Sequence, residues 1–369
     1  RLYRSSIMDE YVPPRYTIEL WHRGKTKVAD ITRLCQDIDW SMTRNGVESL
    51  DFNMSMPDWE EKCRRIGENP NTILKPWVSD IRVKRNGEYL FGAVVVEASR
   101  NLNTDNARVL VQCDGYLNLI DARYLNGRWK GIEATDIAWD IIQEVQNRPN
   151  GDVGITRGSR QYRTGIRRDR MDDWEDINAK DALVSLTNLQ DGKFDFRFTY
   201  DRKFETFQTL GNERPDVVVH YPDDGLGIGA IRMELPQSGA NLYNNIIGKA
   251  SGMGEETIRY SAEDVLSQQE FILREKVQLY NSIKNLSTLA GHCEADVAVM
   301  SRLVDLPRVT VRGTQFDLNN IGVGDRIVVE QSKYSSCPLS GYYRIEQLSV
   351  KVDENMSEEI TLTLDNYDL

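Results

Sequence analysis

The sequence predicts an α+β protein, mostly β, in which two β-barrel or sandwich domains flank a small α+β insertion. Three observations lead to this fold class: apolar residues alternate over the first 125 residues, a four-residue apolar period replaces the alternation in the middle, and alternation returns after Pro307. At about 150 residues per domain, the 369-residue chain is long enough for two or three such domains.

Residues 1–125 are expected to form the first β domain. An Asn-Gly pair at 45–46 suits a two-residue hairpin turn, and a second pair at 86–87 suits another. Apolar residues occupy alternate positions around these turns: Trp40, Met42, Leu50, Phe52, Met54 and Met56 near the first, and Ile81, Val83 and Tyr89–Val96 near the second. A further strand is expected at Val109 and Val111, and closure of such strands gives a barrel or a sandwich.

Residues 126–237 are expected to form the α+β insertion. Ile137, Ile141 and Val145 recur every four residues before Pro149, which predicts a helix. A second helix is expected to end at Gly192, a residue suited to a left-handed C-terminal cap, and it carries Ala182, Leu183, Leu186 and Leu189. A hairpin follows, with Phe194, Phe196, Phe198 and Tyr200 before its turn and Phe204 and Phe207 after it.

Residues 238–369 are expected to form the second β domain with a long amphipathic helix. A strand near Tyr243–Ile247 precedes a loop at Ser251–Gly254. One apolar stripe then predicts a helix over residues 281–302, with Ile283, Leu286, Ala290, Cys293, Val297 and Met300 on it. The helix either packs on its own domain or forms a seam between subunits. Strands are predicted at Val309–Val311, Ile327–Val329, Tyr343–Ile345 and Ile360–Leu364.

A weak internal repeat relates the two β segments. Residues 92–114 and residues 341–365 each begin with a glycine and a strand, continue through a polar excursion, and end in a second strand with an aspartate. Two readings remain open, because any two β-hairpins resemble each other and because two related β domains would produce the same pattern.

Charge and composition exclude several classes of protein. The 46 basic and 57 acidic side chains leave a net charge of −11, which argues against a protein that clamps nucleic acid through phosphates. No segment approaches the ~20 apolar residues of a membrane-spanning helix, so no membrane span is expected. The five cysteines are scattered, which predicts reduced thiols rather than disulfides or zinc. Residue 1 is not Met, so the beginning of the natural chain can lie upstream.

Catalytic, cofactor and metal signatures are weak throughout the chain, so no enzyme, no cofactor and no metal site is predicted. His22, His220 and His292 are far apart in sequence, and His292 and Cys293 point in different directions if they lie on one helix. The glycines at 225, 227 and 229 lack the spacing of a dinucleotide-binding loop. Acidic pairs such as those between Asp172 and Asp176 arise readily among 57 acids.

Six arginines within 14 residues form the one candidate site, interrupted by the acidic Asp169. Three interpretations are open: a solvated loop neutralised by the acids from Asp172 onward, an ionic dock for an acidic partner, or a contact for passing nucleic acid. The dock is favoured, and the acidic stretch Val350–Leu369, possessing a single Lys, is a suitable partner on a neighbouring copy. The candidate interface residues are Arg157, Arg160, Arg163, Arg167, Arg168 and Arg170.

The order of these segments resembles the tail hub proteins of long-tailed bacteriophages, relatives of the baseplate hub of contractile tails. The resemblance covers most of the chain and rests on the order of several short stretches. These are Trp40–Met56, Gly87–Gly92, Cys113–Tyr116 before the first helix, Asn244–Gly248, Val323–Ile327 and Gly341–Ile345. At Gln268–Leu273 the sequence departs from the pattern, because it has no Gly where similar proteins carry Tyr-Gly before Arg.

The resemblance implies two tube-like β domains per chain and a homotrimeric, pseudo-hexameric ring at the tail tip. Implied partners are the tail tube or a distal tail protein, the tape-measure protein, tip or fibre proteins, and double-stranded DNA that passes through the channel without specific binding. The implied location is the virion tail tip, with the host cytoplasm during assembly. An acidic channel wall would let DNA slide. Candidate interface anchors are Trp21, Trp40, Trp59, Trp77 and Trp129.

Two alternative functions remain open at this point. A tail-associated cell-wall hydrolase would require a nucleophile or metal with an activating partner. A receptor- or carbohydrate-binding tip module would be supported by exposed aromatic residues in the middle domain, such as Tyr162 and Trp174.

Overall fold

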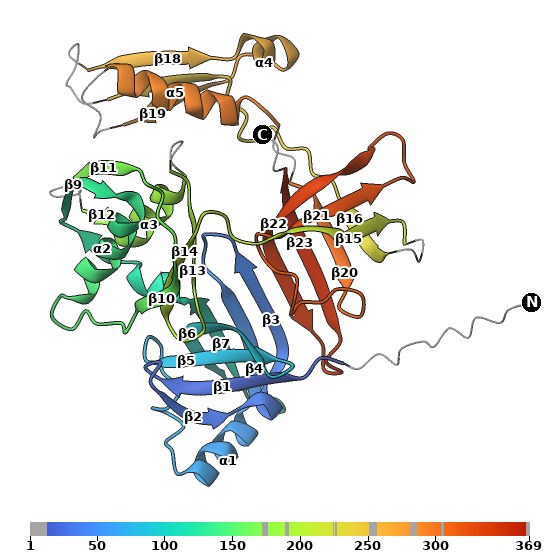
Figure 1. Ribbon diagram of the computed structural model, residues 1–369. Coiled ribbons are helices and arrows are strands. Elements are labelled where there is room, and N and C mark those ends of the chain that lie inside the picture. The colour runs from blue at the N-terminus through green and yellow to red at the C-terminus, as the bar shows by residue number, and fades with distance from the viewer. Residues whose placement is uncertain are drawn as a thin grey trace, which may run out of the picture. The chain divides into compact units, whose positions relative to one another are not determined.

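One hydrogen-bonded sheet of thirteen strands connects the two ends of the described chain in the computed structural model (Figure 1). The structure describes residues 13–171, 176–188, 192–223, 225, 227–250, 257–280, 286–303 and 306–366. The chain divides into two compact units, the first made of residues 1–233 and 309–369 and the second of Glu234–Arg308. The mostly β fold predicted from the sequence is confirmed.

The N-terminal half of the first unit is an open sheet whose strand order is β2-β1-β5-β6-β7-β4-β3. Its core contains the alternating residues that predicted it, with Trp40, Leu50, Phe52 and Met54 all buried. The elements are β1 (Tyr16–His22), β2 (Thr26–Asp30), the 3-10 turn η1 (Thr32–Leu34), β3 (Gln36–Thr43), β4 (Ser49–Ser55), α1 (Met56–Ile66), β5 (Ser79–Arg85), β6 (Glu88–Asn101) and β7 (Arg108–Gly115).

The C-terminal half of the first unit is a closed barrel of six strands. The strand order β22-β21-β15-β16-β20-β23 closes because β23 also pairs with β22. Alternate residues of β23, Ile360, Leu362 and Leu364, fill its interior. The elements are β15 (Glu213–Tyr221), β16 (Ile228–Glu234), β20 (Arg308–Arg312), β21 (Arg326–Gln331), β22 (Leu339–Val352) and β23 (Glu358–Asn366).

A seam of backbone hydrogen bonds joins the two halves. β3 pairs antiparallel with the second half of β22, from Thr43 opposite Gln347 to Ile38 opposite Val352. Residues of both halves therefore belong to one hydrophobic cluster, in which Trp40 and Val350 are both buried. The two β halves are consequently bound to each other along a strand edge rather than by a flexible linker.

The insertion forms a lobe with its own core. Ile137, Ile141 and Val145 are buried on α2, as their four-residue spacing predicts, and Glu133 caps this helix by accepting hydrogen bonds from Thr135 N and Asp136 N. The elements are η2 (Tyr116–Ile120), β8 (Tyr124–Leu125), β9 (Arg128–Glu133), α2 (Ala134–Gln146), β10 (Thr156–Gln161), β11 (Arg167–Met171), β12 (Ile177–Asn178), α3 (Ala179–Thr187), β13 (Asp195–Phe198) and β14 (Lys203–Phe207).

The second unit is a three-stranded sheet with one long helix packed on it. Cys293 and Val297 of the predicted stripe are buried against Ile246 and Ala262 of the sheet, and Leu289, which was not part of that stripe, is buried with them. Leu286 of the stripe is 53% exposed. The helix therefore packs on its own unit, as one of the two interpretations expected. The elements are β17 (Asn245–Lys249), β18 (Arg259–Glu263), α4 (Val265–Glu270), β19 (Glu275–Leu279) and α5 (Leu286–Met300). The predicted loop Ser251–Gly254 and the start of the predicted helix, residues 281–285, lie outside the described residues.

Three local predictions were wrong. Met56 does not continue a strand but begins α1, because Pro57 suits the first turn of a helix and Trp59 and Cys63 fall on one buried face. The connection between β3 and β4 spans five residues around Asn45-Gly46 instead of two. α3 ends at Thr187 with Asn188 as its cap, so Gly192, at φ +72°, turns the chain beyond the helix.

β15 and β16 belong to the barrel, although both strands precede residue 237 and were predicted to be part of the insertion over residues 126–237. Their backbone groups pair with β21 and β20, and this pairing decides their membership. Whether separately folding domains end at residues 125 and 237 remains a prediction.

The two β halves repeat the same strand order. Reading across each half gives β1-β5-β6-β7-β4-β3 and β15-β21-β22-β23-β20-β16. β15 differs from β1 in two ways: it runs parallel to its neighbour β21, and it also pairs with β16, which closes the C-terminal half. β1 runs antiparallel to β5, and among the described residues it does not pair with β3.

The repeat extends to register. β6 and β22 are both 14 residues long, and a register shift follows Val95 in one and Ile345 in the other. Corresponding pairs occur at the start of the hairpins, Ala93 opposite Gly115 and Tyr343 opposite Asn366, and near their ends, Asn101 opposite Arg108 and Lys351 opposite Glu359. The weak sequence repeat thus reflects two related β units, and the reading that any two hairpins look alike is not needed.

Candidate functional site

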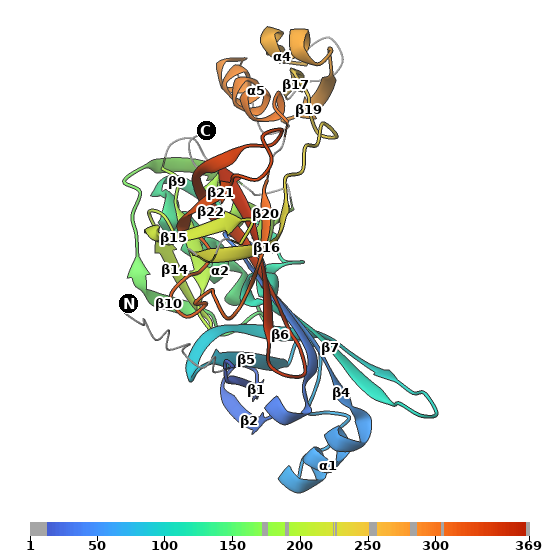
Figure 2. The ribbon, with the colours of Figure 1, turned by 90° about the vertical axis from the view of Figure 1, so that its right-hand side faces the viewer.

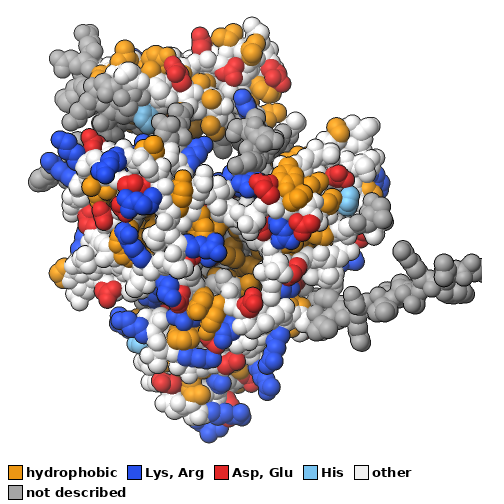
Figure 3. All heavy atoms as spheres, in the orientation of Figure 1, with side chains coloured by type: hydrophobic (Ala, Val, Ile, Leu, Met, Phe, Trp, Pro, Cys, Tyr) orange, Lys and Arg blue, Asp and Glu red, His pale blue; other side chains and the backbone are white. Residues whose placement is uncertain are grey.

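The six candidate arginines lie on two strands of the insertion and the loop between them. Arg157 and Arg160 belong to β10, Arg163 follows it, and Arg167, Arg168 and Arg170 belong to β11. β11 pairs with β9, while β10 pairs with β14 in a separate sheet. Basic side chains gather on the surface over β9 and β11 (Figure 3). The structure therefore divides the sequence cluster into two groups.

The first group surrounds one carboxylate of α2. Asp136 Oδ2 lies 2.9 Å from Arg163 Nη2, and Asp136 Oδ1 lies 3.6 Å from Arg157 Nη2. Arg157 also covers the ring of Trp139 at 5.1 Å from its centroid. Because Arg157 and Arg163 are exposed, these pairs stabilise the lobe little and leave guanidinium surface open to a partner.

The second group lines a cleft of about 510 Å³ on the lobe, together with Ile137 of α2 and Leu186 of α3. Arg167 Nη1 donates to the carbonyl of Gly131 at 2.9 Å, and Arg170 Nη1 donates to Ser185 Oγ at 3.3 Å. Asp169 accepts a hydrogen bond from Gly131 N at 2.7 Å. The cleft thus presents arginine side chains that the Gly131 carbonyl of β9 and the Ser185 hydroxyl of α3 hold in place.

Some of the acids expected to face this cluster lie outside the described residues, and one of the others is buried. Asp172, Asp173 and Glu175 lie outside the described residues, as does Trp174. Within the acidic C-terminal stretch, Glu358 is buried and its carboxylate binds Arg85, at 2.8 Å to both Nε and Nη2. Glu354 and Glu359 remain exposed. Asp353 is exposed as well, so a dock that uses this stretch depends on these exposed carboxylates rather than on Glu358.

The Arg85–Glu358 pair belongs to the core that both β halves share. The phenol of Tyr16 donates to Glu358 Oε1 at 2.6 Å, and Trp40 Nε1 donates to that phenol at 3.2 Å. Burial and the neighbouring Glu358 carboxylate raise the pKa of Tyr16 above its ordinary value. Since Arg85 lies on β5 and Glu358 on β23, this pair connects the two halves beneath the seam.

A second polar junction joins the seam to the insertion. Arg44 Nη1 lies 2.5 Å from Asp195 Oδ1 and its Nε lies 2.9 Å from Glu346 Oε2. Asn45, with φ +51°, donates to Asp195 from its side chain and accepts from Phe196 N at 2.9 Å. The first Asn-Gly pair thus does more than turn the chain, because it holds the β13–β14 hairpin of the lobe.

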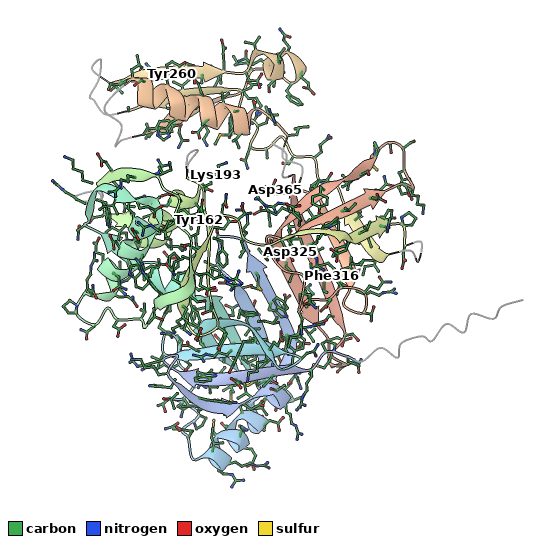
Figure 4. The ribbon with its side chains drawn as sticks, in the orientation of Figure 1. Tyr162, Lys193, Tyr260, Phe316, Asp325 and Asp365 are labelled. Carbon is green, nitrogen blue, oxygen red and sulfur yellow. The ribbon has the colours of Figure 1, made fainter. Side chains whose placement is uncertain are left out.

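A third junction is formed by Gly324 and Asp325, which belong to one of the stretches that resemble tail hub proteins. Asp325 accepts from Asn212 N at 2.7 Å and from Gly322 N at 2.9 Å, and it lies where the chain enters the barrel (Figure 4). Gly211 and Gly324 both have positive φ, and a Cβ on Gly211 would come within 2.1 Å of Gly324 C. Only glycine allows this crossing of two backbones.

Glu48 is a buried carboxyl near these junctions whose pKa is strongly shifted. It lies in the β3–β4 connection, it is 7% exposed, and its Oε2 has no hydrogen-bond partner. Burial raises its pKa from 4.5 to about 7. A Cβ on Gly115 would come within 1.9 Å of Glu48 Oε2, so the glycine at the end of β7 makes room for the carboxyl.

Other chemistry-bearing residues are dispersed. His220 Nδ1 lies 3.2 Å from Glu330 Oε2 at the β15–β21 pair, and the His292 ring lies 5.5 Å from that of Tyr280. Burial raises the pKa of the Cys293 thiol, which faces the sheet while its neighbour His292 does not share that core. Within the described ranges, no group of three or more His, Cys, Asp and Glu side chains could hold a metal ion. No described helix is long and apolar enough to cross a membrane.

The tryptophans proposed as interface anchors divide between core and surface. Trp40 and Trp59 are fully buried, Trp129 is buried, and Trp21 is partly covered by Arg82. Trp77 is 54% exposed. Tyr162, proposed for glycan binding, packs against the core of the lobe (Figure 4). The sequence could not reveal the Arg85–Glu358 and Arg44–Asp195 pairs, because their members are far apart along the chain.

Comparison with known proteins identifies the fold. No family model and no curated protein matches the sequence. Among solved structures, a tail protein from Neisseria meningitidis MC58 is 12% identical, with a TM-score of 0.63 over 95% of this chain and 97% of its own. A 43 kDa tail protein of prophage MuSo2 from Shewanella oneidensis is 12% identical, with a TM-score of 0.62 over 95% of this chain and 98% of its own.

A third structure agrees with the first two. A prophage tail protein from Listeria monocytogenes EGD-e is 12% identical, with a TM-score of 0.53 over 96% of this chain and 95% of its own. The chain therefore has the fold of phage tail proteins, and the resemblance to tail hub proteins found in the sequence is confirmed at the level of the fold.

Proposed function

We propose that this chain is a non-enzymatic structural protein of a phage tail tip, where it forms a homotrimeric ring. The observation that carries the proposal is the repeat of strand order and register in the two β halves. Three chains would supply six related β units, and a ring of six units can join a threefold tip to a sixfold tail tube. The shared fold with phage tail proteins supports this assignment.

The proposed ring connects the tail tube or a distal tail protein to tip or fibre proteins, with the tape-measure protein and double-stranded DNA in its channel. DNA would pass without specific binding, because the net charge of −11 disfavours adhesion of phosphates. Its place is the virion tail tip, and its assembly takes place in the host cytoplasm. A strongly positive inner surface of the ring would contradict this arrangement.

The arginines at 157, 160, 163, 167, 168 and 170 are proposed as an ionic dock for an acidic neighbour. Arg157, Arg160, Arg163 and Arg167 are exposed in the chain described here, and Arg forms bidentate pairs with carboxylates. The exposed Glu354 and Glu359 of another copy are suitable partners.

Native mass measurement of the purified chain tests the proposal. We expect a particle of three chains, because obligate assemblies bury about 2,000 Å² or more between neighbours and survive dilution. Negative-stain images are expected to show a ring with an axial opening. A monomer at micromolar concentration, or a particle without threefold stoichiometry, would overturn the proposed function.

A further inference from the structure

The seam between β3 and β22 has an unoccupied counterpart on β6. β22 uses one edge twice: it pairs with β21 from Leu339 to Arg344, and then with β3 from Gln347 to Val352. β6 pairs with β5 only from Glu88 to Val94. Among the described residues, no strand pairs with that edge of β6 from Glu97 to Asn101.

The backbone around this edge matches the seam closely. The carbonyl of Ile345 accepts from Gly324 N at 2.8 Å immediately before the seam begins, and the carbonyl of Val95 accepts from Trp77 N at 2.8 Å at the corresponding place. Both carbonyls precede the same register shift. The segment Glu97–Asn101 thus stands in the position of Gln347–Lys351, which receives a strand in the other half.

Exposed apolar side chains lie beside the unpaired edge of β6. Trp77 beside it is 54% exposed, and the hairpin that continues it carries Leu102, 76% exposed, and Leu110, 40% exposed. Figure 2 shows the β6–β7 hairpin extending beyond the neighbouring strands. Arg100 Nη2 donates to Pro70 O at 3.0 Å, so the loop after α1 borders the edge through a side chain. The edge strand β2, in contrast, carries the exposed Lys27 and is directly preceded by the exposed Lys25, and exposed lysines discourage strand pairing.

The repeat also indicates which strand fits the edge. In the N-terminal half, β3 pairs with β4 of its own half along one edge and with β22 of the other half along the opposite edge. β16 holds the same place in the order of the C-terminal half. β16 pairs with β15 only at Ile228 and Gly229, and its next residues include Ile231, which is 41% exposed.

We propose that β16 of one copy pairs with Glu97–Asn101 of β6 in a second copy, and so extends the seam around the ring. This inference rests on the proposed trimer and identifies the strands through which neighbouring copies would contact each other. The contact is head-to-tail, because β16 and β6 are different surfaces, and three such contacts close when each turns the chain by a third of a circle. Alternating β3–β22 and β16–β6 seams would then link all six β units.

Disulfide trapping at this joint tests the inference. Ser99 corresponds to Ser349, which lies opposite Ser41 in the seam. Ser99→Cys is combined with Ile231→Cys, and separately with Met233→Cys to allow for register, in full-length protein carrying Cys337→Ser. The other four native thiols are buried. The control combines Ile231→Cys with Glu60→Cys, an exposed position on α1.

We expect reducible covalent dimers and trimers at ~10-fold or greater yield over the control, because pairing raises the effective concentration of the two thiols. Native mass measurement of the same samples separates the outcomes. If the particles are trimers but both pairs behave like the control, the β16–β6 joint is wrong and the trimer stands. If the particles are monomers without cross-links, both the joint and the proposed function are wrong.

Discussion

At the scale of single residues, Glu48 shows how a buried acid shapes the response of the chain to pH. Its side chain is enclosed between the β3–β4 connection and Gly115, and its Oε2 finds no donor. A pKa of about 7 means that the folded chain holds a proton which the unfolded chain releases near pH 4.5. The stability that this group contributes is therefore fully present below pH 4.5 and is lost as pH rises from there through about 7.

Glu48→Gln is expected to remove that decline. The variant keeps the shape of the side chain but cannot ionise, so at pH 8 it should unfold with a free energy about 1–3 kcal/mol greater than the natural chain. At pH 5, near the lower end of this window, the two should differ by much less than at pH 8. Urea unfolding at both pH values measures the difference.

Glu359→Gln is the matched control, because Glu359 is exposed on β23. It should leave the pH dependence of unfolding unchanged. If Glu48→Gln and the natural chain lose stability equally between pH 5 and pH 8, then Glu48 is ionised without penalty in the folded chain, and the prediction is wrong.

At the scale of elements, β17 and α5 approach each other so closely that a single added methyl group on β17 would collide with α5. A Cβ on Gly248 would lie 2.2 Å from Cys293 Sγ and 3.0 Å from Leu289 Cδ1. Both neighbours are fully buried, so neither can move away easily. The helix thus rests on the sheet where the sequence places its smallest residue.

Gly248→Ala is expected to destabilise the second unit by about 1–3 kcal/mol through overpacking. Gly248→Ala combined with Cys293→Ala should recover most of the loss, because the sulfur that blocks the new methyl group is gone. Hydrogen exchange of the β17 amides measures both effects. A double variant as exposed to exchange as Gly248→Ala alone would show that the clash is not the cause.

The elements best predicted from the sequence are those whose pattern is local. α2 and the β13–β14 hairpin follow directly from periodicity, and Asn86-Gly87 forms the predicted two-residue turn with both residues at positive φ. α1 was missed because Met56 continues the alternation of β4, and only Pro57 marks the change. β15 and β16 were assigned to the insertion because strand membership depends on distant partners, which periodicity does not report.

At the scale of the whole molecule, the arginine dock can be tested in assembly. Arg163→Glu, Arg167→Glu and Arg168→Glu together should weaken trimer formation or attachment of the neighbouring tail protein about 10-fold or more, because three attractive contacts become repulsive. Sedimentation of the triple variant, compared at low and high salt, measures the change.

An equal change of charge far from the cluster provides the control. Lys25→Glu, Arg64→Glu and Arg65→Glu alter three exposed residues of the N-terminal half. This variant should assemble like the natural chain. Unchanged assembly of the cluster variant would remove the dock and leave the arginines as a solvated surface paired internally, as Arg163 is with Asp136.

The six arginines are evident in the sequence, but their division into two groups is not. Their spacing gives no sign that Arg157 and Arg163 share Asp136 while Arg167 and Arg170 line a separate cleft. Likewise, Glu358 was counted among surface acids, although Arg85 removes it from the surface through a contact that spans most of the chain. The fold could be predicted from the sequence because it depends on repeated local patterns. The site could not, because it depends on single pairs of residues that are far apart along the chain.

The strand seam inside each chain has a mechanical consequence. Sliding or hinging one β half against the other would break the β3–β22 ladder and expose the ion pair beneath it, which is costly for buried charges. The two β halves of each protomer should therefore move together as one rigid body. Any dilation of the proposed collar during genome delivery would have to take place at its three inter-chain joints, and the bore would widen in steps of whole protomers.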